Sequence, residues 1–287
     1  MAVMLKAKPL AEETGAEIAA KVNGWKAQGR NPAIATILVE GDPASLYYAQ
    51  AKRRLADKLD VKFELHTFPP DVPEEQLLGT IISLNENADV HGIMLELPLP
   101  AGIRLDQLAE AIDPLKDVDG IASTNKLACL TGSPGIYPAT PQSCIRLLRY
   151  YDFSLRGKHV VVIGRGETVG RPLIQMLLRE NATVTICHSH TPDLGAHIRQ
   201  ADIVIAAAGK ANLITPAMVH PKLVIVDAGI NEKPDGSGII GDVDPETAAV
   251  VHALSPVPGG VGTLTTVILF DNVMRAMELQ EAAGRLN

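Results

Sequence analysis

The chain has 287 residues, of which 46% are hydrophobic and 21% are charged, and its formal net charge is −7. That balance is typical of a globular protein, and the acidic charge argues against nucleic acid or an anionic membrane surface as a partner. Aromatic residues make up only 3% of the chain, so aliphatic side chains must fill the core, which suits buried parallel strands covered by helices.

The sequence also indicates where the protein works. No apolar stretch approaches the ~20 residues that a membrane-spanning helix needs, and the opening MAVMLKAKPL contains no long apolar run that would indicate a signal peptide. The three cysteines are odd in number and form no C-x-x-C pair, which favours reduced thiols. We therefore expect a cytoplasmic protein with no membrane partner.

Helices and strands are predicted to alternate along the first half of the chain. Asp42 and Pro43 indicate a helix start, as N-cap and first helical residue. The alternation predicts a parallel sheet with crossover helices. A stretch containing Gly and Pro at 116–139 breaks this rhythm, and we expect an interdomain segment and a functional loop there. The predicted strands cover 32–39, 61–68 and 91–100, and predicted helices cover 11–22, 43 onward and 73–87.

The alternation resumes after Thr140, which is expected to cap a helix from Pro141. The predicted fold class is α/β with two domains. Residues 1–139, with a C-terminal helix at about 264–287, form an N-terminal catalytic domain, and 140–263 form a Rossmann-type dinucleotide-binding domain. The C-terminal helix is expected to pack back on the first domain. In this half, predicted strands cover 158–164, 182–187, 201–209 and 222–229, and helices cover 170–180, 193–200 and about 264–282.

The stretch VVVIGRGETVGRP, at 160–172, contains a glycine turn between a strand and a helix. Gly164, Gly166 and Gly170 read G-x-G-x-x-x-G, one residue longer than the usual dinucleotide fingerprint. A strand, a glycine turn and a helix N-terminus bring backbone N–H groups together, which suits a pyrophosphate. Taken alone, the motif also fits a plain turn in which the glycines only provide tightness.

The following strand distinguishes between the two nicotinamide cofactors. A domain that binds NAD usually places a carboxylate after its second strand, but here His188 to Thr191 contain none. Arg165 in the turn and the hydroxyl of Ser189 suit a 2′-phosphate instead. The sequence therefore favours NADP over NAD, the alternative being that Arg165 and Ser189 simply face solvent.

A second group of candidate residues lies in the first domain. Tyr48 and Lys52 are four residues apart and share a helical face. The block ELPLP, 96–100, stands at the carboxyl end of a predicted strand, where ligands of open α/β sheets bind. The block KDVDG, 116–120, adds two acids. Each could be an ordinary solvated pair or turn, but together in an interdomain cleft they would form a reaction site. The histidines show no metal-binding spacing, so no metal is expected.

Taken in order, these motifs resemble those of the methylenetetrahydrofolate dehydrogenase/cyclohydrolase family, over nearly the whole chain. In that family the glycine turn normally has the longer spacing seen here. The resemblance rests on S-x-x-Y-x-x-x-K at 45–52, LPLP at 97–100, KDVDG at 116–120, P-x-T-P at 138–141, GR-x-x-x-VG-x-P at 164–172, CHS-x-T at 187–191, D-x-GIN at 227–231, GDVD at 241–244 and PVPGGVG at 256–262.

The resemblance implies an NADP-dependent enzyme that acts on a folate in the cleft between its domains and forms homodimers through the cofactor domain. Lys52 would be the central catalytic residue, Tyr48 would pack on the folate ring system, and Asp119 would bind the pterin. The implied catalytic residues are Lys52, Tyr48, Glu96 and Asp119; those for the cofactor are Gly164, Arg165, Gly166, Gly170, Ser189 and Ile230; those for the folate are Tyr48, Lys52, Leu95, Glu96, Leu97, Asp119, Pro258, Gly259, Gly260, Val261 and Gly262.

The chain departs from the family pattern at four positions. Ala139 and Thr263 replace the usual Cys and Pro, and Gly166 replaces a serine, which removes a hydroxyl near the cofactor. Glu96 replaces a glutamine that contacts the catalytic lysine. A carboxylate within ~4–6 Å favours the charged form of a lysine and raises its pKa, and a protonated lysine is a poor base for adding water.

We therefore expect the dehydrogenase activity to survive and the cyclohydrolase activity to be weak or absent. Alternatively, Glu96 is itself protonated or acts as the base. The other functions considered are a diverged oxidoreductase acting on another pterin and a non-catalytic folate binder. The presence of both Tyr48 and Lys52 argues against a pure binder, which has little use for that pair.

Overall fold

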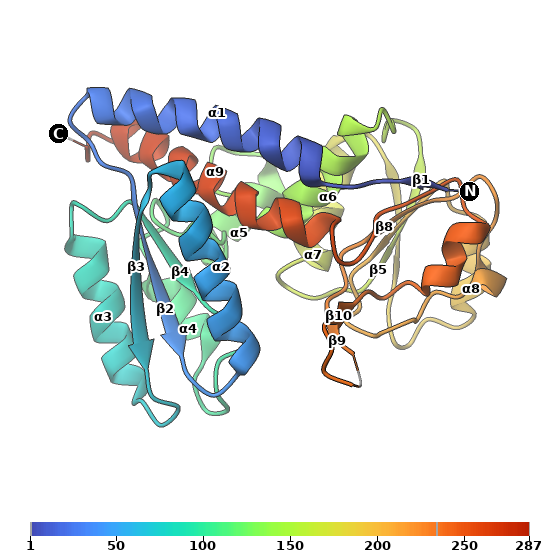
Figure 1. The fold of residues 1–287 in the computed structure, drawn as a ribbon, viewed down its shortest axis with the longest axis horizontal. Helices are drawn as coiled ribbons and strands as arrows, with labels where there is room; N and C mark the ends of the chain where they lie inside the picture. The colour runs from blue at the N-terminus through green and yellow to red at the C-terminus, as the bar shows by residue number, and fades with distance from the viewer. Residues whose placement is uncertain (1, 234, 287) are drawn as a thin grey trace. The chain divides into compact units, whose positions relative to one another are not determined.

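The computed structural model describes residues 2–233 and 235–286, and the chain divides into two compact units (Figure 1). The three-stranded unit consists of Glu13–Ala139 and Thr266–Asn287, and the six-stranded unit of Met1–Glu12 and Thr140–Thr265. Each unit is built on a parallel sheet, so the predicted α/β class with two domains is confirmed.

The sheet of the three-stranded unit has the order β3-β2-β4 with all strands parallel. All seven residues of the central strand β2 are buried, because a strand covered on both faces by helices reads as a continuous apolar run. One face packs on Leu77, Ile81 and Leu84, which follow one another at helical spacing on α3. The elements of this unit are α1 (Lys8–Ala27), β2 (Ala33–Val39), α2 (Pro43–Leu59), β3 (Lys62–Phe68), α3 (Glu74–Glu86), β4 (Gly92–Leu95), α4 (Leu105–Ala111), α5 (Ser123–Thr131) and most of α9 (Val261–Ala282).

The sheet of the six-stranded unit has the order β1-β11-β8-β7-β5-β6, again all parallel. β5 lies between β6 and β7, so the chain crosses from β5 outward to β6 and then back past β5 to β7, in opposite directions along the sheet. Such a switch point marks the ligand edge of a doubly wound sheet. The elements are β1 (Val3–Met4), α6 (Ala139–Tyr150), β5 (His159–Ile163), α7 (Gly170–Arg179), β6 (Thr183–Cys187), α8 (Leu194–Arg199), β7 (Ile203–Ala206), β8 (Val224–Asp227), β9 (Asn231–Glu232), β10 (Ile239–Ile240) and β11 (Ala253–Leu254).

Four features of the fold differ from the expectations. Residues 1–12, expected in the first domain, belong to the six-stranded unit, because β1 pairs with β11. The strand predicted at 91–100 ends at Leu95, since the prolines that follow cannot donate to a ladder. The expected loop at 116–139 contains helix α5, and α4 was not predicted at all. These helices are only nine and seven residues long, too short to show a clear apolar period.

The last helix packs on the three-stranded unit, as expected. It lies beside α1 (Figure 1), and Lys21 of α1 forms an ion pair with Asp271 at 3.2 Å. The side-chain amide of the buried Asn272 donates to the backbone oxygens of Val118 at 2.8 Å and Tyr137 at 2.9 Å. α9 therefore fixes the segment that carries the KDVDG motif.

Among residues 2–233 and 235–286, no helix combines the length and the apolar character needed to cross a membrane.

Candidate active site

Lys52 and Glu96 are in direct contact, a point that the sequence left open. Nζ of Lys52, on α2, donates to Oε1 of Glu96, just after β4, at 2.6 Å. The side chains are 18% and 6% exposed. The backbone N–H of Glu96 donates to Ile37 O at 2.9 Å, which continues the strand ladder by one residue. The pair thus lies at the carboxyl edge of the sheet, with the lysine end reachable from solvent.

Asp119 is the third charged group of this cluster. Burial raises the pKa of its carboxyl to about 7; the ammonium of Lys52 opposes the rise, whereas the carboxylates of Asp117 and Glu96 add to it. The backbone N–H of Leu95 also faces this carboxylate. A lysine with two acids beside it can bind, orient and exchange a proton with a ligand at this edge.

The two acids of KDVDG have different partners, which the sequence could not distinguish. Both carboxylate oxygens of Asp117 accept backbone N–H groups, from Ile121 at 3.1 Å and Ala122 at 2.9 Å, and Asn125 adds a side-chain donor at 2.9 Å. Asp117 therefore holds the chain that leads into α5. Only Asp119 faces Lys52.

A tight turn fixes Asp119. Gly120 has φ +67°, and a Cβ atom there would lie 2.8 Å from Ile136 O and 2.9 Å from the Pro138 nitrogen. No larger residue fits without moving that backbone. The conformation that directs Asp119 toward Lys52 is therefore set by the neighbouring segment as well as by the turn itself.

The other predicted residues of this unit differ in exposure. Tyr48 lies one turn before Lys52 on α2, is half-buried, and packs its ring edge-on against Tyr47 at 5.8 Å. Leu95 is buried in the hydrophobic core, whereas Leu97 is 38% exposed. Leu95 therefore packs in the core under the end of β4. Of these three side chains, those of Tyr48 and Leu97 are exposed enough to contact a ligand.

In the six-stranded unit, two of the three glycines of the turn are required by close packing. Gly164, directly after β5, has φ +116°, and a Cβ atom there would collide with Ala207 O; one at Gly170 would collide with Gly164 O. Gly166 is different, because a Cβ atom there would meet nothing within 4 Å. The turn therefore has room for the serine that the resembling family carries at this position.

The carboxyl ends of the neighbouring strands β8, β7, β5 and β6 bring the predicted cofactor residues to one sheet edge. Arg165, Ser189 and Ile230 follow β5, β6 and β8 respectively, and all three are exposed, Ile230 by 52%. Within the described part of the chain, Arg165 has no hydrogen-bond or ion-pair partner. A free cation, an open glycine turn, a hydroxyl and an exposed aliphatic side chain fit a dinucleotide at this edge.

The PVPGGVG loop lies in the same unit. Gly259 has φ +101° and its carbonyl accepts a hydrogen bond from Ala7 N at 2.9 Å. A Cβ atom at Gly262, in the first turn of α9, would lie 3.9 Å from Ile230 Cδ1. The loop predicted to contact folate is therefore next to a residue predicted to contact the cofactor. The residues of this loop that the resemblance assigns to the folate are Pro258, Gly259, Gly260, Val261 and Gly262.

Sequence reasoning assigned no role to Asp227 and Asp242, which occurred only as letters of two motifs. Both are buried behind the cofactor edge and bind backbone N–H groups. The available signal was a glycine close to each acid: Gly241 directly precedes Asp242, and Gly229 follows Asp227 by two residues. Across residues 2–233 and 235–286, no three His, Cys, Asp or Glu side chains are grouped to hold a metal ion.

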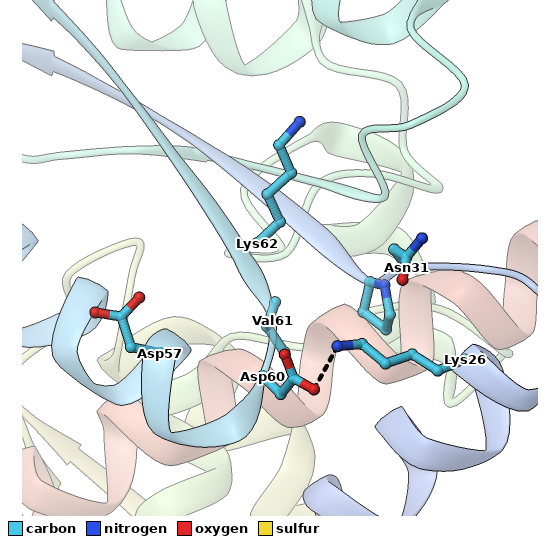
Figure 2. A pocket seen from close by; sticks show the side chains of 7 residues that line it. Lys26, Asn31, Asp57, Asp60, Val61 and Lys62 are labelled. Atoms are coloured by element: carbon cyan, nitrogen blue, oxygen red, sulfur yellow. Dashed lines mark ion pairs between the residues drawn. The ribbon is translucent and has the colours of Figure 1, made fainter.

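A pocket also occurs at the opposite edge of the three-stranded sheet, where β2 and β3 begin (Figure 2). Lys26 and Asp60 form an ion pair across it. It contains none of the predicted site residues, and ligands of parallel sheets bind at the carboxyl edge, so we assign no activity to it. Its lining residues are Lys26, Asn31, Pro32, Asp57, Asp60, Val61 and Lys62.

Known proteins resemble this chain over nearly its whole length. Sequence models of the tetrahydrofolate dehydrogenase/cyclohydrolase catalytic domain and NAD(P)-binding domain match residues 5–119 and 138–281. The bifunctional protein FolD 2 of Desulfitobacterium hafniense is 50% identical over 286 residues, covering 99% of this chain and 100% of that protein.

Solved structures agree with the sequence comparison. The bifunctional FolD of Campylobacter jejuni has a TM-score of 0.94 and 36% identity, covering 98% of this chain and 100% of that one. The FolD enzyme of Trypanosoma brucei, solved with NADP and an inhibitor, has a TM-score of 0.93 and 30% identity, covering 98% of both chains.

Proposed function

The chain belongs to the tetrahydrofolate dehydrogenase/cyclohydrolase family, and on that premise we propose that it oxidises methylene-tetrahydrofolate to methenyl-tetrahydrofolate with NADP. In this step the one-carbon bridge loses a hydride, which the nicotinamide accepts. The observation that carries the proposal is the contact of Lys52 with Glu96 beside Asp119, at the carboxyl edge of the sheet.

The residues of the three-stranded unit would orient the folate. Asp119 would bind the pterin, Tyr48 would lie against its ring, and Lys52 would stand beside the one-carbon bridge. The carboxyl of Asp119, with a pKa of about 7, can donate or accept a hydrogen bond at neutral pH, because both its protonated and its ionised form are present. Positioning of this kind contributes much of the acceleration of a hydride transfer, because the two carbons must approach closely.

An absorbance assay of the purified protein tests this function. Methylene-tetrahydrofolate with NADP should produce reduced cofactor at a rate proportional to protein concentration. Catalysis on a different pterin would identify a diverged oxidoreductase. Tight folate binding without turnover with either nicotinamide cofactor would leave a non-catalytic binder and refute the proposal.

We further propose that the second family activity, the hydration of methenyl- to formyl-tetrahydrofolate, is weak here. Adding water to the methenyl carbon requires a group that takes a proton from the water. Nζ of Lys52 donates to the Glu96 carboxylate at 2.6 Å, so this nitrogen is engaged by an anion, whereas a neutral amide at position 96 would only orient it.

The variant Glu96→Gln separates the two possible roles of Glu96. If the carboxylate restrains Lys52, hydration should increase about tenfold in the variant while hydride transfer changes little. If Glu96 is the base, hydration should fall instead. Wild-type hydration at a rate comparable to hydride transfer would contradict the restraint.

We propose NADP, rather than NAD, as the preferred cofactor. The support is the unpaired, exposed Arg165, the exposed hydroxyl of Ser189, and the lack of a carboxylate at the end of β6. The ratio of kcat/KM for the two cofactors measures the preference. Equal values would overturn it and would fit the loss of the serine at Gly166.

We also propose that the protein is a cytoplasmic homodimer. All three cysteines are buried thiols that form no disulfide in the described part of the chain, which fits a reducing compartment. The dimer rests on family resemblance. Sedimentation of the purified protein over a range of concentrations tests it, and a monomer at every concentration would refute it.

A further inference from the structure

The carboxylate of Asp242, in the six-stranded unit, is fully buried. Oδ2 accepts the backbone N–H groups of Ala208 at 2.6 Å and Gly209 at 3.0 Å. Oδ1 accepts the backbone N–H of Lys210 at 2.8 Å and the side-chain amide of Asn231 at 3.0 Å. Four donors fill the acceptor capacity of a carboxylate, so Asp242 has none left for a ligand.

The segments that Asp242 binds border the candidate cofactor edge. Residues 208–210 follow β7 after Ala207, and Asn231 is next in the chain to Ile230. The backbone N–H of Ala207 donates to Ile163 O at 2.7 Å. The carbonyl of Ala207 packs so closely on Gly164 that no side chain fits there. A shift of the segment after β7 would therefore move the glycine turn.

Asp227 fixes Asp242 in turn. Its Oδ1 accepts the backbone N–H groups of Gly229 at 2.9 Å and Asp242 at 3.1 Å, and its Oδ2 accepts that of Val243 at 2.9 Å. Any Cβ atom at Gly229 would collide with the Asp242 carboxylate, and one at Gly241 would collide with the Asp227 carboxylate. Backbone encloses both acids so tightly that neither can rotate to another partner.

We propose that Asp242 is a positioning residue for the dinucleotide: its carboxylate holds segments 208–210 and 230–231 where the glycine turn and Ile230 can receive the cofactor. Asp242 acts through these segments and does not touch the cofactor itself. The inference rests on the proposed function and extends it from the residues at the edge to the buried acid behind them.

The variant Asp242→Asn tests the inference. In this variant an NH2 group replaces one of the two acceptor oxygens. Because that oxygen accepted from two N–H donors, and an NH2 group cannot accept, two of the four hydrogen bonds are lost. The KM for NADP should rise about tenfold, while the KM for methylene-tetrahydrofolate and kcat change less than about twofold. The control is Asp244→Asn, which removes a carboxylate two residues away whose one hydrogen-bond donor among residues 2–233 and 235–286 is Glu246 N.

Two further variants keep the test decisive. Asn231→Ala removes a single one of the four hydrogen bonds, remains usable if Asp242→Asn does not fold, and should raise the KM for NADP about threefold. The double variant Asp242→Asn with Asn231→Asp restores a donor–acceptor pair between the two side chains and should recover part of the NADP affinity.

If Asp242 has a purely structural role, its variants should have a lower melting temperature while the KM values for NADP and for methylene-tetrahydrofolate stay unchanged. That result, or an equal change in both KM values, would overturn the inference. Calorimetric titration of the wild type with NADP and with NAD distinguishes the failures. If the wild type binds neither, the proposed function fails along with the inference; if wild type and variant bind NADP equally, only the inference fails.

Discussion

In the three-stranded unit, Lys52 and Glu96 neutralise each other side chain to side chain, and the lysine remains 18% exposed. In the six-stranded unit, the buried carboxylate of Asp242 is neutralised by backbone N–H groups and one amide. Both arrangements occur at the carboxyl edge of a parallel sheet. A pair of side chains can exchange partners with a ligand, whereas a carboxylate saturated by backbone can only hold that backbone in place.

The comparison is tested most strongly by removing the lysine. Lys52→Met should lower hydride transfer and any hydration by ~10³-fold, because acid–base and positioning contributions of a central lysine fall in the range ~10²–10⁴. Initial rates with methylene- and methenyl-tetrahydrofolate measure the loss. The control is Lys58→Met, in the last turn of the same helix and exposed. A variant within tenfold of wild type would show that the Lys52–Glu96 pair is only structural.

The acids of the two units should also differ in the pH range over which they affect stability. Burial raises the pKa of Asp227 to about 6 and that of Asp119 to about 7. A raised carboxyl pKa means that the folded state binds the proton more readily than the unfolded state. The stabilisation is therefore complete below the unfolded pKa of about 4 and is lost as pH rises through the folded value.

For Asp227 the free energy of unfolding falls by at most ~3 kcal/mol as pH rises, at ~1.4 kcal/mol per pKa unit, and the fall ends near pH 6. For Asp119 the fall continues to near pH 7. Trp25, the single tryptophan, is buried in α1 and reports on the three-stranded unit. Urea unfolding followed by its fluorescence should show a decline between pH 6 and 7 that Asp119→Asn abolishes and Asp227→Asn does not. An unchanged decline in Asp119→Asn would contradict the assignment.

A buried charge held by backbone also occurs in the three-stranded unit, which sharpens the comparison. Nζ of Lys116 donates to the carbonyls of Leu84, Asn85 and Asn87 at 3.0, 2.8 and 2.8 Å, at the end of α3. Lys116→Met should lower the free energy of unfolding by ~2 kcal/mol, because three carbonyls lose their donor and the helix loses a cation at its C-terminus.

Urea unfolding followed by Trp25 fluorescence measures this loss, with the exposed Lys62→Met as the control. The turnover of the folded fraction should stay unchanged. Intact stability with reduced turnover in Lys116→Met would contradict the comparison. It would mean that a charge bound by backbone can act in turnover, as a charge bound by a side chain does.

These contacts show what the sequence could and could not predict. The continuous apolar run of β2 and the helical apolar period of α3 predicted both elements to within a residue or two, since burial on a sheet imposes these patterns. The family resemblance singled out Lys52 and Glu96, but the sequence left open whether they touch, and only the structure shows the contact. The separate tasks of Asp117 and Asp119 were not predictable, because they depend on backbone N–H groups and on a turn held by distant residues.

The same limit applies to the buried acids of the other unit. The donors of Asp242 lie more than thirty residues away in the chain, apart from Asn231. Backbone N–H groups carry no residue identity, so no side-chain pattern at 208–210 marks them as partners of a carboxylate. The folded sheet brings these N–H groups to Asp242: β7 pairs with β8, and Asp227 at the end of β8 accepts the backbone N–H groups of Asp242 and Val243.

The smallest effect is expected at Arg165, a charge bound neither by backbone nor by another side chain in the described part of the chain. An exposed arginine that binds a 2′-phosphate contributes ~1 kcal/mol, so Arg165→Ala should raise the KM for NADP about fivefold and leave that for NAD unchanged. Arg165→Lys should retain part of the preference, because a point charge remains without the planar fork. The control is Arg171→Ala, since Arg171 is equally exposed but already paired with Glu167 at 3.0 Å. Equal changes in both KM values would mean that Arg165 only faces solvent. Arg165 would then contribute no more to binding the 2′-phosphate than Arg171 does.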